Sequence, residues 1–154
     1  MWGSLAVFIV AVIMVAMTGA IFKPGPWYET LEKPSWTPPD WAFPVVWSIL
    51  YLFIAIAGWL VWQSSGWSLA LALWILQLLL NGAWSWLFFG LKRMDLAFVD
   101  VSLLWLCIAG FIVIAWPIST TAALLFLPYL VWVSIAAALN LTVWRMNPIA
   151  VSSP

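Results

Sequence analysis

Histidine is absent from this chain, and cysteine occurs once, as Cys107. Without histidine the chain lacks the commonest side-chain ligand of metals and of haem iron, and no group of cysteines or carboxylates replaces it. A single cysteine forms no internal disulfide, and within an apolar helix it is generally a small packing residue. We therefore expect no metal site, no required cofactor and no redox role for Cys107.

Charged side chains are scarce as well. They make up 6% of the 154 residues, against 67% hydrophobic ones, and five basic and five acidic residues cancel to zero net charge. A soluble domain carries about 25% charged residues, so this is the composition of an integral membrane protein whose surroundings are lipid. Zero net charge gives no reason to expect nucleic acid as a partner. The period-two alternation of membrane β-strands is missing too, which predicts an all-α membrane protein.

Long apolar runs define the helices. Residues 1–22, 41–91 and 101–144 carry no charge, and breaks at 63–66 and 117–120 divide the second and third runs. Because about 20 apolar residues cross a bilayer, we predict five spans in a single bundle. Their expected bounds are about 2–22, 43–62, 68–90, 95–116 and 120–145, in one domain covering residues 1–154. The first run has no basic segment before it, so we expect a retained helix rather than a signal peptide. Pro128 should kink the fifth span.

The basic residues predict the orientation. With five spans, all of them fall in the first loop, the third loop or the C-terminal end, at Lys23, Lys33, Lys92, Arg93 and Arg145. Basic residues favour the cytoplasmic side of a membrane. The N-terminus should therefore lie outside and the C-terminus in the cytoplasm. We expect a bacterial inner membrane, with an outer membrane as the alternative.

Asp100 is the one acidic residue well inside a predicted span. Intramembrane carboxylates are candidates for function. The plainer interpretation, which we favour, is an ion pair with Lys92 or Arg145 near the cytoplasmic surface, because a lone carboxylate is poor evidence for a proton relay.

Residues 23–42, between the first two spans, form a loop of unusual composition. Proline fixes φ and removes hydrogen-bond donors, so this segment cannot be a membrane helix and should be stiff. We predict a structured lid at the membrane surface. Its defining residues are Trp27, Tyr28, Lys33, Pro34, Trp36, Pro38 and Pro39.

Three of the spans place aromatic and amide side chains along one helical face. The sets are Pro44, Trp47 and Tyr51; Gln77, Asn81, Trp84 and Phe88; and Tyr129, Trp132, Ala136, Leu139 and Asn140. One interpretation is a packed core in which Asn81 and Asn140 bond between helices. The other is a flat slot beside small residues such as Gly82 and Ala136, suited to a planar and mostly apolar ligand.

These residues resemble the family of tryptophan-rich sensory proteins and translocator proteins, also called peripheral-type benzodiazepine receptors. The resemblance begins with Trp27-Tyr28 and Lys33-Pro34-Ser35-Trp36-Thr37-Pro38-Pro39, and it continues through Trp47, Gln77, Asn81, Trp84, Asp100, Pro128-Tyr129, Leu139-Asn140 and Asn147. It covers roughly residues 19–147. It implies five helices whose first loop covers a cavity that is open toward the cytoplasm. The implied ligands are porphyrins such as protoporphyrin IX and haem, synthetic isoquinolines and benzodiazepines, and in animals cholesterol.

The resemblance also implies which residues line the cavity. They are Trp47, Asn81, Trp84, Trp132, Ala136 and Leu139, with Tyr51, Phe88 and Asn140 as neighbours. A homodimer is implied as well. The animal sterol motif has a tyrosine where this chain has Leu141, so we do not predict sterol binding.

The leading functional hypothesis is a membrane protein that binds porphyrins and other planar hydrophobic ligands, in tetrapyrrole sensing or regulation. Its basic residues at the cytoplasmic rim would meet the ligand's carboxylates. One alternative is an enzyme that degrades bound porphyrin with light and oxygen, with Trp47 and Trp132 as the reactive pair. Another is a transporter of porphyrin or a similar amphiphile, although no inverted repeat accompanies it.

Overall fold

The computed structural model of the chain describes residues 2–148, which contain helices and no strand. The elements are α1 (Trp2–Ile21), α2 (Pro26–Glu29), α3 (Ala42–Ser65), α4 (Leu69–Ser85), the π-helical turn η1 (Trp86–Gly90), α5 (Met94–Ala115), α6 (Thr120–Leu125) and α7 (Leu127–Met146). Helix α4 continues directly into η1, and a single residue separates α6 from α7. The polypeptide therefore makes five long rods.

Each of the five rods is long and apolar enough to cross a membrane, which confirms the predicted fold class. The observed spans are Trp2–Ile21, Ala42–Ser65, Leu69–Gly90, Met94–Ala115 and Thr120–Met146. The largest difference from the predicted bounds is at the end of α3, where polar residues 63–65 add a last turn before Gly66. Gly66 ends the helix with φ +58°, a left-handed conformation that glycine adopts without strain.

At the turn between α3 and α4 and at the turn between α5 and α6, a serine side chain caps the helix that follows. Ser68 accepts a hydrogen bond from the backbone N–H of Leu71 at 3.3 Å, and Ser119 accepts one from Ala122 at 3.2 Å. Such caps satisfy N–H groups that the first turn of a helix leaves without an intrahelical acceptor. The two polar breaks in the sequence are therefore tight turns between antiparallel spans.

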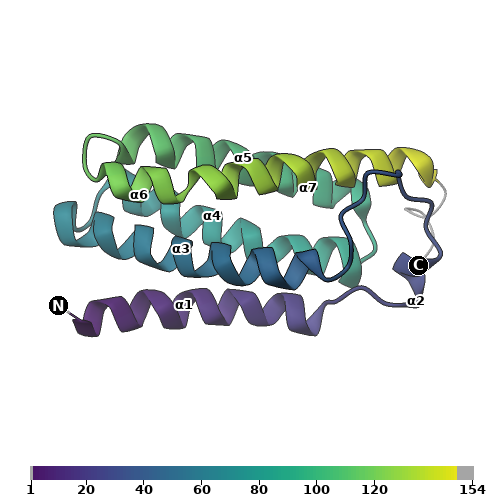
Figure 1. Cartoon of the computed structure of the whole chain (residues 1–154), viewed down its shortest axis with the longest axis horizontal. Coiled ribbons are helices and arrows are strands. Elements are labelled where there is room, and N and C mark those ends of the chain that lie inside the picture. Colours follow the sequence, from purple (N-terminus) through teal and green to yellow (C-terminus); the bar gives the residue numbers. More distant parts are fainter. Residues whose placement is uncertain (1, 149–154) are drawn as a thin grey trace.

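The rods lie side by side, with α1 at one edge of the bundle (Figure 1). Helix α1 packs on α3 and α4, α4 packs on α5, and α5 packs on α7. The loop that holds α2, the connection from η1 to α5 and the end of α7 all lie at one end of the bundle (Figure 1). All five basic residues are in these segments, so the fold gathers them on one side, as predicted from the span count.

The fifth rod is broken at Phe126, two residues before Pro128. Proline has no N–H to donate to the carbonyl four residues earlier, and its ring crowds that carbonyl. Regular helical hydrogen bonding begins again at Leu130, whose N–H donates to the Phe126 carbonyl at 2.9 Å. A kink was predicted at Pro128, and the structure has a break in the helix at Phe126. The break has a consequence for the site: α6 packs on α3, whereas α7 packs chiefly on α5.

Tight packing fills the half of the bundle away from the lid. Gly58 on α3 lies against the buried ring of Trp74 on α4, whose Nε1 donates to the Ile54 carbonyl at 2.8 Å. Phe8 of α1 meets the same ring edge-on, with centroids 5.0 Å apart. These contacts hold α1, α3 and α4 closely together at this level of the bundle.

Candidate ligand-binding site

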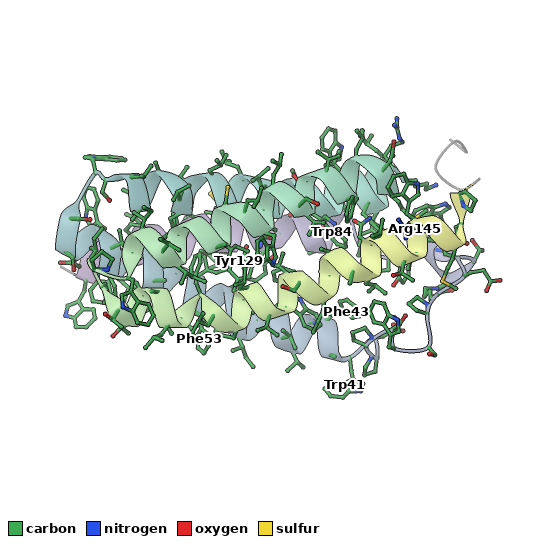
Figure 2. The ribbon with its side chains drawn as sticks, turned by 90° about the horizontal axis from the view of Figure 1, so that it is seen from above. Trp41, Phe43, Phe53, Trp84, Tyr129 and Arg145 are labelled. Carbon is green, nitrogen blue, oxygen red and sulfur yellow. The ribbon has the colours of Figure 1, made fainter. Side chains whose placement is uncertain are left out.

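A group of aromatic rings joins α3 to α7 below the lid. Trp47 stacks on Tyr51, with ring centroids 5.4 Å apart and planes 27° from parallel. The same indole stands edge-on to Trp132 at 6.5 Å and to Tyr129 at 6.3 Å. Phe43, one turn before Trp47, meets Trp132 edge-on at 5.5 Å, and Figure 2 shows it beside α7. The face predicted on α3 therefore meets the face predicted on α7.

Side chains, rather than closely packed backbones, fill this part of the interface between α3 and α7. Helix α3 lies close to α6 before the break at Phe126, but α3 and α7 have little backbone contact. An apolar groove of about 350 Å³ opens there. It is lined by Val46, Ile49, Leu50, Pro128, Val131, Trp132 and Ile135. Since Ile49, Val131 and Ile135 are exposed, the groove opens on the outer surface of the bundle.

Trp132 connects the groove to the ring group. It lines the groove and also contacts Trp47 and Phe43. Its indole Nε1 is buried and has no hydrogen-bond partner. A buried N–H without an acceptor is costly, so it marks a place where a ligand carbonyl or carboxylate would be bound favourably.

A chain of hydrogen bonds runs beside the rings through three helices. The Tyr51 hydroxyl donates to Asn81 Oδ1 at 3.2 Å, and Asn81 Nδ2 donates to the Tyr129 hydroxyl at 2.7 Å. Tyr129 in turn donates to Gln77 Oε1 at 2.8 Å, and Gln77 is fully buried with its Nε2 unpartnered. These bonds fix Tyr51, and through it Trp47, relative to α4 and α7.

A second aromatic group lies under the lid. Trp84 stacks on Phe88 with centroids 5.0 Å apart, and its Nε1 donates to Asn140 Oδ1 at 3.0 Å. Asn140 Nδ2 donates to the Met94 carbonyl at 2.9 Å, so this one amide joins α4, α5 and α7. Leu139 is buried beside Phe88 in the same cluster. Trp84 thus belongs with the lid, while Trp47 and Trp132 form the neighbouring group; Figure 2 shows Trp84 and Tyr129 lying between the helices.

The π-helical turn at Trp86–Gly90 shapes this second group. Its wider turn places two successive rings, Phe88 and Phe89, under the loop: Tyr28 meets them edge-on at 6.1 and 5.5 Å. Periodicity of 3.6 residues predicted Phe88 on the inner face but gave no sign of the π turn, which adds Phe89 to the contact. Such turns inside helices are frequent at functional sites.

The first loop lies over this end of the bundle (Figure 1). Leu31 is only 8% exposed and packs into the cluster that contains Phe88 and Leu139. Trp27 meets Phe88 edge-on at 6.0 Å. The Lys33 ammonium lies 4.4 Å from the centre of the Tyr28 ring and donates to the Leu31 carbonyl at 3.3 Å. Burial, and more weakly the charge of Asp40, raises the pKa of the Tyr28 phenol, which stays neutral against the apolar rings.

The rest of the loop faces outward. The N–H of Thr37 donates to the Pro34 carbonyl at 3.1 Å, which closes a turn whose Trp36 is 49% exposed. Pro38 is half-buried and Pro39 is exposed. Trp41, at the start of α3, is 69% exposed and projects away from the bundle in Figure 2. Of the predicted lid residues, Trp27, Tyr28 and Lys33 therefore take part in contacts within the lid or with the bundle, whereas Trp36 points to the surroundings.

Two sequence-based expectations are wrong. Asp100 is 6% exposed and makes no ion pair with Lys92 or Arg145; within residues 2–148 the single ion pair joins Arg93 to Asp95 at 2.6 Å. Asp100 Oδ2 has no hydrogen-bond partner. Gly82, expected beside the rings, faces α1 instead, where an added Cβ would meet Val15 at 3.5 Å. Both positions follow from how α4 and α5 are rotated in the bundle, which helical spacing does not specify.

Several contact residues were absent from the predicted site. Phe43 lies one turn before Trp47, so helical spacing could have found it. Gln77 and Tyr129 were placed on the correct faces but were not assigned to the ligand. Leu31 carried no readable signal, and Asn147 entered only through the family resemblance with no role assigned, because the roles of both residues depend on contacts with distant segments. Ala136 is half-buried on α7, one turn after Trp132.

The fold and the ring groups define a multi-pass helical membrane protein with an aromatic cluster inside the membrane, beneath a tryptophan- and proline-rich loop. A sequence profile of the TspO/MBR family matches residues 6–145. The chain belongs to that family. It is 43% identical over 147 residues to Protein CrtK of Rhodobacter capsulatus, covering 93% of this chain and 92% of the relative. It is 40% identical over 146 residues to the tryptophan-rich sensory protein of Cereibacter sphaeroides, covering 95% and 92%. It is also 40% identical over 126 residues to the human translocator protein, covering 79% and 75%.

Proposed function

We propose that this protein binds porphyrins, such as protoporphyrin IX and haem, and other planar hydrophobic molecules within the membrane, in tetrapyrrole sensing or regulation. The observation that carries the proposal is the contact of Trp47 with Trp132, across helices whose backbones stand apart. A planar molecule that enters here replaces the edge-on contact between the two indoles with stacking on their faces. The apolar groove beside Trp132 supplies room for its rings. The printed name of one relative, a tryptophan-rich sensory protein, agrees with a sensing role.

The ligand's polar groups have partners in the same region. The unpartnered Nε1 of Trp132 is a donor for a carbonyl or carboxylate inside the membrane. At the basic end of the bundle Arg93 is engaged by Asp95. Lys92 and Arg145 make no ion pair within residues 2–148, so they are the cations we assign to propionate groups of a porphyrin. We infer that this end faces the cytoplasm, because basic residues favour that side.

A titration with protoporphyrin IX tests the site. In detergent or nanodiscs, a Trp47→Ala, Trp132→Ala double variant should bind at least tenfold more weakly than the native chain, measured by the shift of the porphyrin absorption band. The matched control is Trp2→Ala, Trp67→Ala, which removes two exposed indoles. Equal binding by the native chain and the Trp47, Trp132 variant would eliminate this site.

Haem provides a second check on the same proposal. The chain contains no histidine, and the hydroxyls of Tyr51 and Tyr129 are engaged in hydrogen bonds. Metal-free porphyrin and haem should therefore bind with affinities within a few-fold of each other. A low-spin haem spectrum with two axial ligands would contradict this account of the site.

A second candidate function is the oxidation of bound porphyrin by oxygen in light. The observation that favours it is the row of oxidisable rings formed by Trp132, Trp47 and Tyr51. An excited porphyrin stacked on Trp47 is placed to exchange an electron with the indole, and no acid or base is required. Illumination of the complex in air should then yield a new absorbing product that free porphyrin does not give. Simple bleaching at the rate of free porphyrin would rule this activity out.

A further inference from the structure

A single side chain fastens the lid to the end of the last span. Asn147 Oδ1 accepts a hydrogen bond from the Glu32 backbone N–H at 2.9 Å, and Asn147 Nδ2 donates to the Glu32 carbonyl at 2.8 Å. The amide thus pairs with both polar groups of one residue, as a neighbouring strand would. Asn147 Nδ2 also donates to the Val143 carbonyl at 2.8 Å, which fixes the amide on its own helix.

No other side-chain hydrogen bond joins residues 23–41 to the long helices in the part of the chain that the structure describes. The loop's remaining side-chain bonds are internal, from Thr30 to Trp27, from Lys33 to Leu31 and from Thr37 to Pro34. Lid closure therefore depends on the Asn147 amide and on apolar contacts. Both bonds to Glu32 are exposed to solvent, so water can replace them at small net cost.

The apolar contact lies one residue before the clasped backbone. Leu31 packs against η1, α5 and α7, in the cluster of Phe88, Met94, Leu139 and Val143. Val143 lies one helical turn before Asn147 on α7. The clasp at Glu32 and the insertion of Leu31 consequently form one unit, and the loop cannot withdraw Leu31 without breaking the Asn147 pair.

We propose that Asn147 is the latch of the lid: it holds the first loop closed over the aromatic groups and sets how fast the loop opens. The prolines of the loop keep it stiff, so it opens as a rigid unit when water replaces the hydrogen bonds of Asn147 and Leu31 leaves its cluster. Asn147 is a positioning residue, because it reaches neither aromatic group. Where the proposal concerns ligand exchange, it rests on the proposed function.

Opening of the lid can be measured without any ligand. In a Cys107→Ala background, a Leu31→Cys reporter reacts with a maleimide only when the loop opens, since residue 31 is 8% exposed when it is closed. Adding Asn147→Ala should raise the labelling rate at least fivefold. Asn147→Asp should raise it by a smaller factor, because a carboxylate still accepts from the Glu32 N–H but cannot donate to the Glu32 carbonyl. The control is Thr142→Ala, which removes a bond confined to α7. An unchanged rate in Asn147→Ala would overturn the proposal.

Amide hydrogen exchange separates a latch from a residue needed for folding. In Asn147→Ala, with Leu31 and Cys107 native, peptides from residues 26–40 should exchange at least fivefold faster, while peptides from α5 keep their protection. Loss of protection in α5 would show that Asn147 stabilises the whole bundle, and the latch would be rejected.

Stopped-flow binding of protoporphyrin IX tests the consequence for exchange. The latch stabilises the closed lid with and without ligand, so Asn147→Ala should raise the association and dissociation rates by the same factor, about tenfold, at an unchanged Kd. Unchanged rates in a variant that labels faster would refute the lid as the route of exchange. If the native chain binds no porphyrin, the proposed function fails, and the labelling result still decides the latch.

Discussion

The indole N–H of Trp84 on α4 donates to the side-chain carbonyl of Asn140 on α7, at 3.0 Å. The amide nitrogen of Asn140 reaches the Met94 carbonyl at the start of α5, and Asn140 is almost fully buried. Three spans thus share one polar side chain within an apolar interior. Hydrogen bonds between membrane helices are worth about 0.6 kcal/mol on average, but a buried group that loses its partner costs about 1–3 kcal/mol.

Replacing Asn140 should therefore destabilise the bundle. Asn140→Leu leaves the Trp84 N–H and the Met94 carbonyl without partners, and we expect a loss of about 1–3 kcal/mol in the free energy of unfolding. Unfolding in mixed micelles, followed by circular dichroism, measures it. Ser102→Ala is the control, because its hydroxyl bonds only to the Phe98 carbonyl on its own helix. Equal stability of Asn140→Leu and Ser102→Ala would contradict the assigned role.

The Tyr129 hydroxyl should contribute more to the free energy of unfolding than the Tyr51 hydroxyl. Tyr129 is fully buried and bridges Asn81 to Gln77, whereas Tyr51 is half-buried and makes one bond of 3.2 Å. We expect Tyr129→Phe to lower the free energy of unfolding by about 1–2 kcal/mol and Tyr51→Phe by about 0.5 kcal/mol or less. The same unfolding assay compares the two. The reverse order would show that the bridge at Tyr129 is not the stronger link.

Gly58 and Gly110 should respond differently to alanine. A Cβ at Gly58 would overlap the Trp74 indole, with Nε1 at 2.6 Å and Phe8 at 2.9 Å, whereas at Gly110 it would make ordinary contact with Leu73 at 3.5 Å. Overpacking costs about 1–3 kcal/mol, and alanine gains up to about 1 kcal/mol of helix propensity. Gly58→Ala should lower the midpoint of thermal unfolding, and Gly110→Ala should keep or raise it. A stable Gly58→Ala would mean that α3 and α4 separate more easily than the packing of Trp74 indicates.

Labelling of intact cells tests the orientation. In a Cys107→Ala background, Ser64→Cys lies in the last turn of α3 and Lys23→Cys lies at the opposite end of the bundle (Figure 1). If the basic end faces the cytoplasm, a membrane-impermeant maleimide should label Ser64→Cys in intact spheroplasts and Lys23→Cys only after permeabilisation. The opposite pattern would invert the topology and move the lid outside.

Much of the fold follows from local properties of the chain. Apolar runs and their polar breaks predicted the five spans to within about three residues, because burial in hydrocarbon requires a continuous helix of fixed length. The inner faces were also predictable: Trp47 stacks on Tyr51, and Trp84 stacks on Phe88, as helical spacing requires. The break near Pro128 followed from the missing N–H. These features depend on residues within a few turns of one another, so the sequence was sufficient to predict them.

Relations between helices were harder to predict. Spacing placed Trp47, Trp84 and Trp132 on inner faces, but packing puts Trp84 with Phe88 and leaves Trp47 with Trp132. The π turn at Trp86–Gly90 shifts the residues after it, so Phe89 also meets Tyr28. Asp100 lacks the cationic partner that its position near the basic end suggested. The relative rotation of packed helices decides each of these, and a pattern within one helix does not contain it.

The sequence by itself determined that this is a five-span helical membrane protein, which faces carry its aromatic side chains, and that its first loop cannot be a membrane helix. Only the tertiary structure decided which rings meet, where the groove opens and what fastens the loop. Glu32 and Asn147 are 115 residues apart in the chain, yet one amide joins them. The physical reason is that helix formation depends on neighbours within a turn, whereas a contact between distant segments depends on the packing of every helix between them.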